Sequence, residues 1–374
     1  MITISLCMIV RNEENSLARC LGSVEGITDE IVIVDTGSTD KTKELAASFG
    51  AVVFDFVWID HFAAARNFSF SKATSDYILW LDADDFIEEK DRQKILRIKH
   101  TLTPDVVAVS MNYNLSFDSD GNVISSLRRN RLVKRECNFQ WIGPVHEYLE
   151  VFGYPLMSDA AITHSKDKVH TDRNLRIYRA RAEAGEAFSP RDLYYYANEL
   201  RENGFFEEAA DYYHRFLDTD KGWIEDNYQA CLKLALCYEQ LAQPKRQAEA
   251  LLRTLQYDIP RSEFCCRYGA FLFGQEKYND AAYWYELATA LPERTANMGM
   301  QDKITMTWLP HLQLCLCYDR LGQYERASYH NEAAAYYAPS HPSMKYNRDY
   351  FKQRLGAAYT ELEWRAPQDR GRNE

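Results

Sequence analysis

Three carboxylates follow a run of apolar residues in the first quarter of the chain. The run is Tyr77-Ile78-Leu79-Trp80-Leu81, and Asp82, Asp84 and Asp85 come directly after it. Such a run is typical of a strand buried on both faces of a sheet. On an extended chain Asp82 and Asp84 point to the same side, where they repel each other unless a proton or cation lies between them. Mg²⁺ or Mn²⁺ meets that need. Alternatively, the carboxylates cap a helix that begins near Ile87.

The elements around this run alternate between strand and helix patterns. Apolar, β-branched segments at residues 2–10, 30–35, 51–56 and 77–81 predict strands, and the segments 11–21, 41–49 and 62–73 between them predict helices. This alternation indicates a parallel sheet with right-handed crossovers. Neither a GxGxxG fingerprint nor a Walker loop is present, so the predicted α/β domain is Rossmann-like without either phosphate loop.

Polar residues follow each of these predicted strands and should gather at one edge of the sheet. A carboxylate that ends a strand, such as Asp35, can accept a hydrogen bond from a ribose hydroxyl or a base N–H. Arg66 is suited to a phosphate or to an acidic neighbour. Together these groups suggest an enzyme that uses a nucleotide-activated donor. The residues are Arg11, Asn12, Glu13, Asp35, Ser38, Asp40, Arg66 and Asn67.

The second half of the chain repeats a helical hairpin pattern. Small residues recur where helices touch, aromatic residues fill the gaps, and proline ends several units, which is typical of tetratricopeptide repeats. The copies lie near residues 192–210, 232–250, 260–292 and 309–339. We therefore expect a catalytic domain at 1–168, a connecting helix at 169–188, an all-α repeat domain at 189–355 and a polar tail at 356–374.

Composition narrows the class of protein. A chain of 374 residues favours two domains, and a net charge of −11 disfavours a nucleic-acid partner. No apolar run reaches the ~20 residues of a membrane span. The nine cysteines, an odd number without metal-type spacing, indicate core thiols in a reducing cytoplasm. Helical repeats often pair through exposed hydrophobic faces, so the sequence is compatible with a homodimer.

Residues 1 to about 165 resemble family 2 glycosyltransferases with the GT-A fold. The matching motifs are Met8-Ile9-Val10-Arg11-Asn12-Glu13-Glu14, Asp35-Thr36-Gly37-Ser38-Thr39-Asp40-Lys41-Thr42, Ala65-Arg66-Asn67 and Asp82-Ala83-Asp84. The resemblance implies an inverting enzyme that uses Mn²⁺ or Mg²⁺ and a nucleotide sugar, expected to be a UDP-sugar. Its expected donor-binding residues are Val10, Arg11, Asn12, Glu13, Asp35, Ser38, Asp40, Arg66, Asn67, Asp82 and Ala83, and its expected metal ligands are Asp82, Asp84 and His164.

The catalytic base departs from the pattern of the best-known members, which use an Asp of a Glu-Asp pair. Here the candidate is Glu147, preceded by His146, which could orient it or bind a phosphate. This motif combined with a repeat tail is similar to the sublancin-type peptide S-glycosyltransferases, which implies a peptide or protein acceptor. Trp141 could then be a platform for the acceptor.

Structural roles remain open for these residues. His146 and His164 could be ordinary strand or loop histidines, and Trp141 could be a core residue. Glu147 could pair with the basic cluster at residues 128–135, itself expected to be a solvated strand face. Two other functions also remain: transfer to a surface polysaccharide or lipid-linked sugar, and a repeat adaptor with an inactive catalytic domain.

Overall fold

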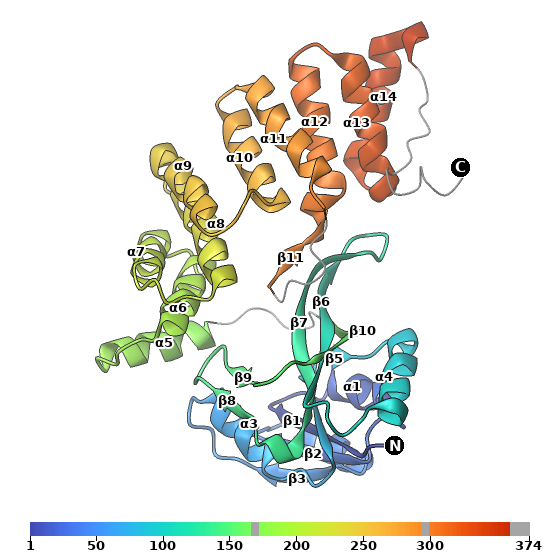
Figure 1. Cartoon of the computed structure of the whole chain (residues 1–374), viewed down its shortest axis with the longest axis vertical. Helices are drawn as coiled ribbons and strands as arrows, with labels where there is room; N and C mark the ends of the chain where they lie inside the picture. The colour runs from blue at the N-terminus through green and yellow to red at the C-terminus, as the bar shows by residue number, and fades with distance from the viewer. Residues whose placement is uncertain (166–171, 293–298, 360–374) are drawn as a thin grey trace. The chain divides into compact units, whose positions relative to one another are not determined.

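The computed structural model describes residues 1–165, 172–292 and 299–359. The chain divides into two compact units, Met1–Ser116 with Ser126–Glu186, and Phe117–Ser125 with Ala187–Glu374. The first is a mixed sheet with helices and the second is almost entirely helical (Figure 1). The expected α/β domain followed by tetratricopeptide-like helices is thus confirmed. Most of the expected polar tail, residues 360–374, lies outside the described residues.

The first unit begins with the alternating elements that the apolar runs predict. Its strands are β1 (Ile4–Val10), β2 (Glu30–Asp35), β3 (Val52–Asp55), β4 (Tyr77–Trp80), β5 (Asp85–Phe86), β6 (Ala108–Phe117), β7 (Val123–Lys134), β8 (Gln140–Ile142), β9 (Tyr148–Glu150) and β10 (Leu156–His164). Its helices are α1 (Leu17–Ser23), α2 (Thr42–Ser48), α3 (Phe62–Phe70), α4 (Glu89–Thr101) and α5 (Arg173–Glu183). The tip of the β6–β7 hairpin falls in the second unit.

The main sheet has the strand order β3-β2-β1-β4-β7-β6-β10-β5. The pairs β1–β2, β1–β4 and β2–β3 are parallel, whereas β4 and β7 are antiparallel. Because β1, β2 and β4 run the same way, their carboxyl ends meet at one edge. The polar residues that follow these strands therefore share a side of the sheet.

Both faces of this sheet are buried, as the uninterrupted apolar runs predict. Leu6, Met8 and Leu79 pack with buried residues of α1 and α4 on one face. Cys7 and Ile78 are the neighbours in sequence of these residues and point to the other face, where they pack with Val133 and with Phe70 of α3. The strand ends that carry the polar residues are therefore fixed from both sides.

The first predicted helix differs from the structure. We expected it to begin within residues 11–14, but α1 begins at Leu17. Asn12 has a left-handed backbone (φ 53°), and its Oδ1 accepts a hydrogen bond from the Thr39 N–H (2.8 Å). These contacts hold residues 11–16 as a loop that joins the ends of β1 and β2. In a helix, these residues would lie farther from the edge of the sheet.

The second unit consists of successive antiparallel helical pairs followed by a single helix (Figure 1). The pairs are α6 (Pro190–Glu202) with α7 (Phe206–Leu217), α8 (Ile224–Gln240) with α9 (Pro244–Arg253), α10 (Ser262–Gly274) with α11 (Tyr278–Ala290), and α12 (Trp308–Arg320) with α13 (Tyr324–Tyr337); α14 (Pro342–Leu355) follows, and the short strand β11 (Gln301–Asp302) precedes α12. Within the described residues, no helix has both the length and the hydropathy that crossing a bilayer requires.

Small residues bring the paired helices close together. A Cβ on Gly269 of α10 would lie 2.9 Å from the ring of Tyr285 on α11, closer than packed atoms approach. The start of α6 is fixed by a capping box, in which the Ser189 hydroxyl accepts from the Asp192 N–H and the Asp192 side chain accepts from the Ser189 N–H. These features explain why the repeat pattern could be recognised in the sequence.

A histidine pair between α12 and α13, with His311 buried and His330 partly buried, predicts how the stability of the second unit depends on pH. The Nδ1 atoms of His311 and His330 lie 3.1 Å apart, and burial lowers the pKa of His311 to about 4 and that of His330 to about 3. Below pH 6.5 both histidines bind protons in the unfolded chain, whereas in the folded protein they stay neutral because their pKa values are lowered. We therefore expect the free energy of unfolding to fall by about 2 kcal/mol per pH unit between pH 6 and 4.

Chemical denaturation followed by circular dichroism at several pH values measures this slope. His330→Gln should flatten the pH dependence, whereas the same change at His100, exposed on α4, should not. Equal slopes in both variants and the parent protein would contradict the assignment.

Candidate active site

A cavity of about 440 Å³ lies at the edge where β1 and β4 end, and it brings together most of the residues singled out in the sequence. Loops after β1 and β4, helix α3, the β8–β9 hairpin, the end of β10 and the start of α5 all contribute to it. Its lining includes the expected residues Val10, Arg11, Asn12, Glu13, Arg66, Asp82, Ala83, Asp84, His146, Glu147 and His164.

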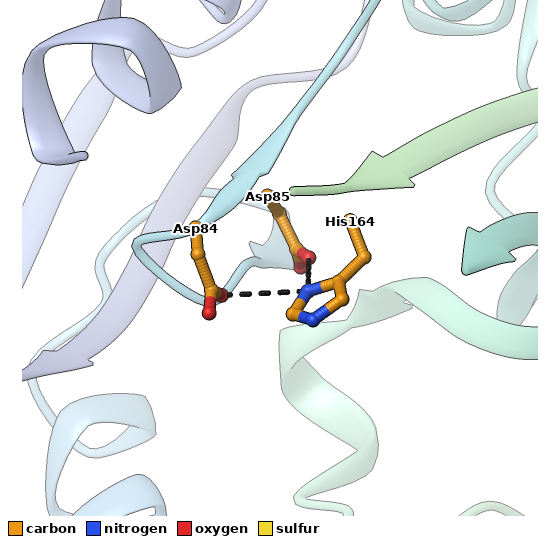
Figure 2. Close-up of side chains that lie close together, drawn as sticks. All are labelled: Asp84, Asp85 and His164. Atoms are coloured by element: carbon orange, nitrogen blue, oxygen red, sulfur yellow. Dashed lines mark ion pairs between the residues drawn. The ribbon is translucent and has the colours of Figure 1, made fainter. Parts of the chain in front are cut away.

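Asp84 and His164, which line the cavity, form a cluster with the buried Asp85 (Figure 2). His164 Nδ1 lies 3.6 Å from Asp84 Oδ1 and 3.5 Å from Asp85 Oδ1. The register of β10 against β5 pairs His164 with Asp85, and the Ser165 N–H donates to the Asp84 carbonyl oxygen (2.9 Å). One ligand atom from each of the three side chains lies within 4.8 Å of the others, a spacing that suits a metal ion.

The charges of this cluster also favour a cation. Burial and the neighbouring Asp82 carboxylate raise the pKa of Asp84 to about 6. The Asp85 carboxylate raises the pKa of His164. His164 Nδ1 is buried and makes no hydrogen bond within the described residues. A divalent ion would relieve the repulsion at Asp84 and give this nitrogen a partner.

The cluster includes Asp85 and not Asp82, which differs from our expectation that Asp82 and Asp84 point to the same side of an extended chain. The Asp85 N–H donates to the Asp82 carbonyl oxygen (3.0 Å), so the chain turns directly after β4 and the alternation of an extended strand does not apply. The turn directs Asp82 toward Arg66, and Asp85 takes the place beside Asp84 and His164.

Asp85 is already neutralised by groups behind the cluster. Arg131 Nη1 lies 3.1 Å from Asp85 Oδ2 with both side chains fully buried, and the Tyr113 hydroxyl donates to Asp85 Oδ1 (2.8 Å). The Arg131 guanidinium lies between the rings of Trp80 and Tyr113, 3.9 and 4.3 Å from their centroids. Asp84 and His164 are therefore the ligands best placed for a metal. The basic cluster at residues 128–135 was expected to be a solvated strand face. Arg131 instead lies inside the sheet, because β7 pairs with β4 there.

Arg66 links two further carboxylates of the cavity, Asp82 and Glu147. Its Nη2 lies 2.7 Å from Asp82 Oδ1, and its Nε lies 2.6 Å from Glu147 Oε1. The guanidinium lies over the rings of Trp80 and Trp141, 5.3 and 4.7 Å from their centroids. Burial acts to raise the pKa of Asp82, but the charge of Arg66 outweighs it and holds that pKa below its usual value. Arg66 was expected to contact either a phosphate or an acidic neighbour. In the structure it contacts acidic side chains.

Trp141 and Asn67 position the site without lining it. Trp141, expected as an acceptor platform, is only 4% exposed and its ring packs edge-on against Trp80 with centroids 4.7 Å apart. The Asn67 amide donates to the Trp141 carbonyl oxygen and its Oδ1 accepts from the Trp141 N–H. The tryptophan is therefore a core residue, and Asn67 attaches the β8–β9 hairpin, and with it Glu147, to α3.

Asp35, Ser38 and Asp40 shape the neighbouring loop and do not line the cavity. Asp35 Oδ1 accepts from the N–H groups of Gly37 and Ser38, while its Oδ2 is buried without a hydrogen bond in the described part of the chain. Asp40 accepts from the backbone N–H groups of Thr42 and Glu14.

Some lining residues had escaped the sequence analysis. They are Trp58 and Phe62, which follow β3, and Arg173 and Asn174 at the start of α5. The rule that placed residues after the other parallel strands could have found the first two. No local signal marks the last two, because α5 comes from the segment expected to be only a connection.

Arg66 gives a prediction about stability. Arg66→Met leaves Asp82 and the mostly buried Glu147 without their shared cation, so the free energy of unfolding should fall by about 2 to 4 kcal/mol. Urea denaturation measures this change. Arg97→Met at an exposed position of α4 is the matched control, and an equal loss in both variants would contradict a structural role for the bridge.

Comparison with known proteins relates most of this cavity to a known family. Residues 5–151, less than half of the chain, match the family model of Glycosyl transferase family 2, so this part of the chain is similar to that family. A TPR repeat-containing protein of Synechococcus elongatus is 36% identical over 40% of this chain and 36% of its own length. The glycosyltransferase SunS of Bacillus subtilis is 25% identical over 63% of this chain and 58% of its own length.

Solved structures give looser matches. MamA (residues 41 to the end) from Desulfovibrio magneticus RS-1 is 18% identical, with 46% of this chain and 88% of that chain covered and a TM-score of 0.37. The chain spans only about a third to somewhat over half of the length of the curated relatives described here.

Proposed function

We propose that this chain is an inverting glycosyltransferase that moves a sugar from a nucleotide sugar, expected to be a UDP-sugar, to a peptide or protein side chain. One observation carries the proposal: a single cavity holds Asp84 and His164 together with Glu147, and most of its lining comes from residues 5–151, which match Glycosyl transferase family 2. The first group suits a diphosphate with its metal, and the second suits a nucleophile that must lose a proton.

The donor would occupy the edge of the sheet beside Asp84. Mn²⁺ or Mg²⁺ held by Asp84 and His164, when bound, would supply positive charge that stabilises the departing diphosphate. Asp82, fixed by Arg66, is proposed to bind the nucleotide. We retain Asp35, with its unsatisfied Oδ2, as a proposed ribose or base contact.

Glu147 is the proposed base. The acceptor atom would form its bond to the anomeric carbon as the bond from that carbon to the diphosphate oxygen breaks, and the acceptor proton would pass to Glu147. Arg66 holds one oxygen of this carboxylate, Oε1, so that the orientation of Glu147 is fixed. His146, with a left-handed backbone (φ 50°) and its ring stacked on that of Tyr178, is proposed as a neighbouring positioning group.

The acceptor class is supported by the tetratricopeptide-like helices, which we propose bind a peptide or protein. The nine cysteines are all free, and this supports placing the protein in a reducing cytoplasm. The alternative acceptor is a surface polysaccharide or a lipid-linked sugar. Whether two copies of the chain form a homodimer is a separate question, which light scattering can answer.

Donor hydrolysis tests the proposal. Purified protein would be incubated with UDP-, GDP- and dTDP-sugars and Mn²⁺, and the released nucleoside diphosphate would be quantified. We expect release from one donor and dependence on the metal. If no donor is hydrolysed and calorimetry detects no nucleotide binding with Mn²⁺, the proposal fails and an adaptor with an inactive catalytic domain replaces it.

A further inference from the structure

A second and larger cavity, of about 780 Å³, adjoins the one just described. The two cavities share Arg11, Trp58 and Arg173 in their linings, so they are neighbours within the first unit. The second also extends along α5 and includes Pro144, whereas Asp84 and Glu147 line only the first. A molecule in the second cavity would therefore meet the first at the three shared residues.

Helix α5 gives this second cavity a positive lining. Arg173, Arg176 and Arg181 line it from successive turns of the helix, and Arg11 adds a fourth guanidinium from the loop after β1. Two carboxylates, Asp60 and Glu186, also line it, and Glu186 pairs with Arg181 (2.7 Å). Arg176 pairs with Asp172 (3.3 Å), which does not line the cavity. Arginines outnumber carboxylates here, although the whole chain carries a net charge of −11.

The opposite wall is partly apolar. Trp58 and Ile59 line the cavity. The side chain of Ile59 is 59% exposed, and that of Val57, which precedes Trp58 and does not line the cavity, is 84% exposed. The loop is held by the Trp58 indole N–H, which donates to Asp60 Oδ1 (2.8 Å), and by packing of the Trp58 ring on Phe62. Exposed apolar side chains beside a row of arginines suit a ligand that carries both apolar and acidic groups.

Contacts near its N-terminal end hold α5 against the rest of the unit. The Arg173 guanidinium lies over the Phe62 ring, 4.6 Å from its centroid. The Tyr178 ring stacks on His146, one residue before Glu147, with centroids 6.4 Å apart. The arginine row is thus placed by the same segment that carries the proposed base.

We propose that this cavity binds an acidic, extended peptide segment of the acceptor and directs it toward Glu147. This inference rests on the proposed function and moves recognition of the acceptor onto the catalytic unit itself. Charge complementarity selects the occupant, since four arginines line a cavity that shares residues with the donor cavity. A nucleic acid fits less well, because carboxylates and exposed apolar residues lie among the arginines.

Binding of defined peptides to the full chain tests the proposal. The probes are a short fluorescein-labelled peptide of alternating Glu and Leu around a central Ser, the same peptide with Lys in place of Glu, and inorganic phosphate. We expect the acidic peptide to bind more tightly than the basic one by fluorescence anisotropy. The double variant R176E/R181E should weaken its binding by roughly tenfold or more, and R97E on α4 should not.

Four results would overturn the proposal: equal binding of both peptides, unchanged binding in R176E/R181E, displacement of the acidic peptide by equimolar phosphate, or loss of UDP–Mn²⁺ binding in R176E/R181E. The last would assign the cavity to the donor. Peptide binding in a protein that never binds UDP or hydrolyses a donor would instead leave this site standing while the proposed function fails, so the two failures are distinguishable.

Discussion

Replacing Asp84 with asparagine is expected to abolish metal-dependent donor hydrolysis while making the metal-free protein more stable. Asparagine keeps the shape of the side chain but cannot neutralise a divalent ion, so turnover should fall by about a hundredfold or more. Loss of activity with a gain in stability is not what general damage to the fold would produce.

The gain in stability follows from the raised pKa of Asp84. Burial and Asp82 raise that pKa to about 6, above its value in the unfolded chain, so ionised Asp84 costs folding free energy above pH 6. The uncharged asparagine removes this cost, and the free energy of unfolding at pH 8 should rise by about 1 to 2 kcal/mol. The gain should vanish below about pH 3, where the carboxyl group is protonated in both states.

Donor hydrolysis with Mn²⁺ and thermal unfolding with and without Mn²⁺ measure the two effects. Asp105→Asn, at an exposed position before β6, is the control and should change neither. A variant D84N that retains Mn²⁺-dependent hydrolysis, or that is still stabilised by Mn²⁺, would remove Asp84 from the metal site.

The general position of the cavity could be predicted because it depends on strand direction alone. β1 and β4 are parallel and their apolar runs are unmistakable, so Glu13, Asp82 and Asp84 had to lie at one edge. The exchange between Asp82 and Asp85 could not be predicted. It depends on a turn after β4 that is closed by one backbone hydrogen bond and by the register of β5 against β10.

Arg131 and the arginines of α5 show the other limit of sequence reasoning. Arg131 belongs to a run of basic residues that is typical of a solvated surface, and only the pairing of Leu132 with Leu79 places it beside Trp80 and Asp85. Arg173 and Arg176 face a cavity only because α5 packs on Phe62 and His146. Such contacts join segments far apart in the chain, and local periodicity carries no information about them.

Replacing Glu147 with glutamine is expected to separate donor use from transfer, and to reveal the acceptor atom. The glutamine side chain can still accept a hydrogen bond from Arg66, so the site should keep its shape and UDP–Mn²⁺ binding should be unchanged. Transfer to a hydroxyl needs a base in the transition state, and its rate should fall about a hundredfold or more. A thiol is already partly ionised near neutral pH, so transfer to a cysteine should fall much less.

Two versions of one acceptor peptide, with Ser or Cys at the modified position, make this comparison by mass spectrometry. Glu150→Gln, at the exposed end of β9, is the control for a change of charge in the same hairpin. If E147Q transfers sugar to the Ser peptide at the parent rate, Glu147 is not the base, and its contact with Arg66 is structural. If only the Ser peptide loses transfer, Glu147 acts by removing the acceptor proton, because an effect on the donor would slow both peptides equally.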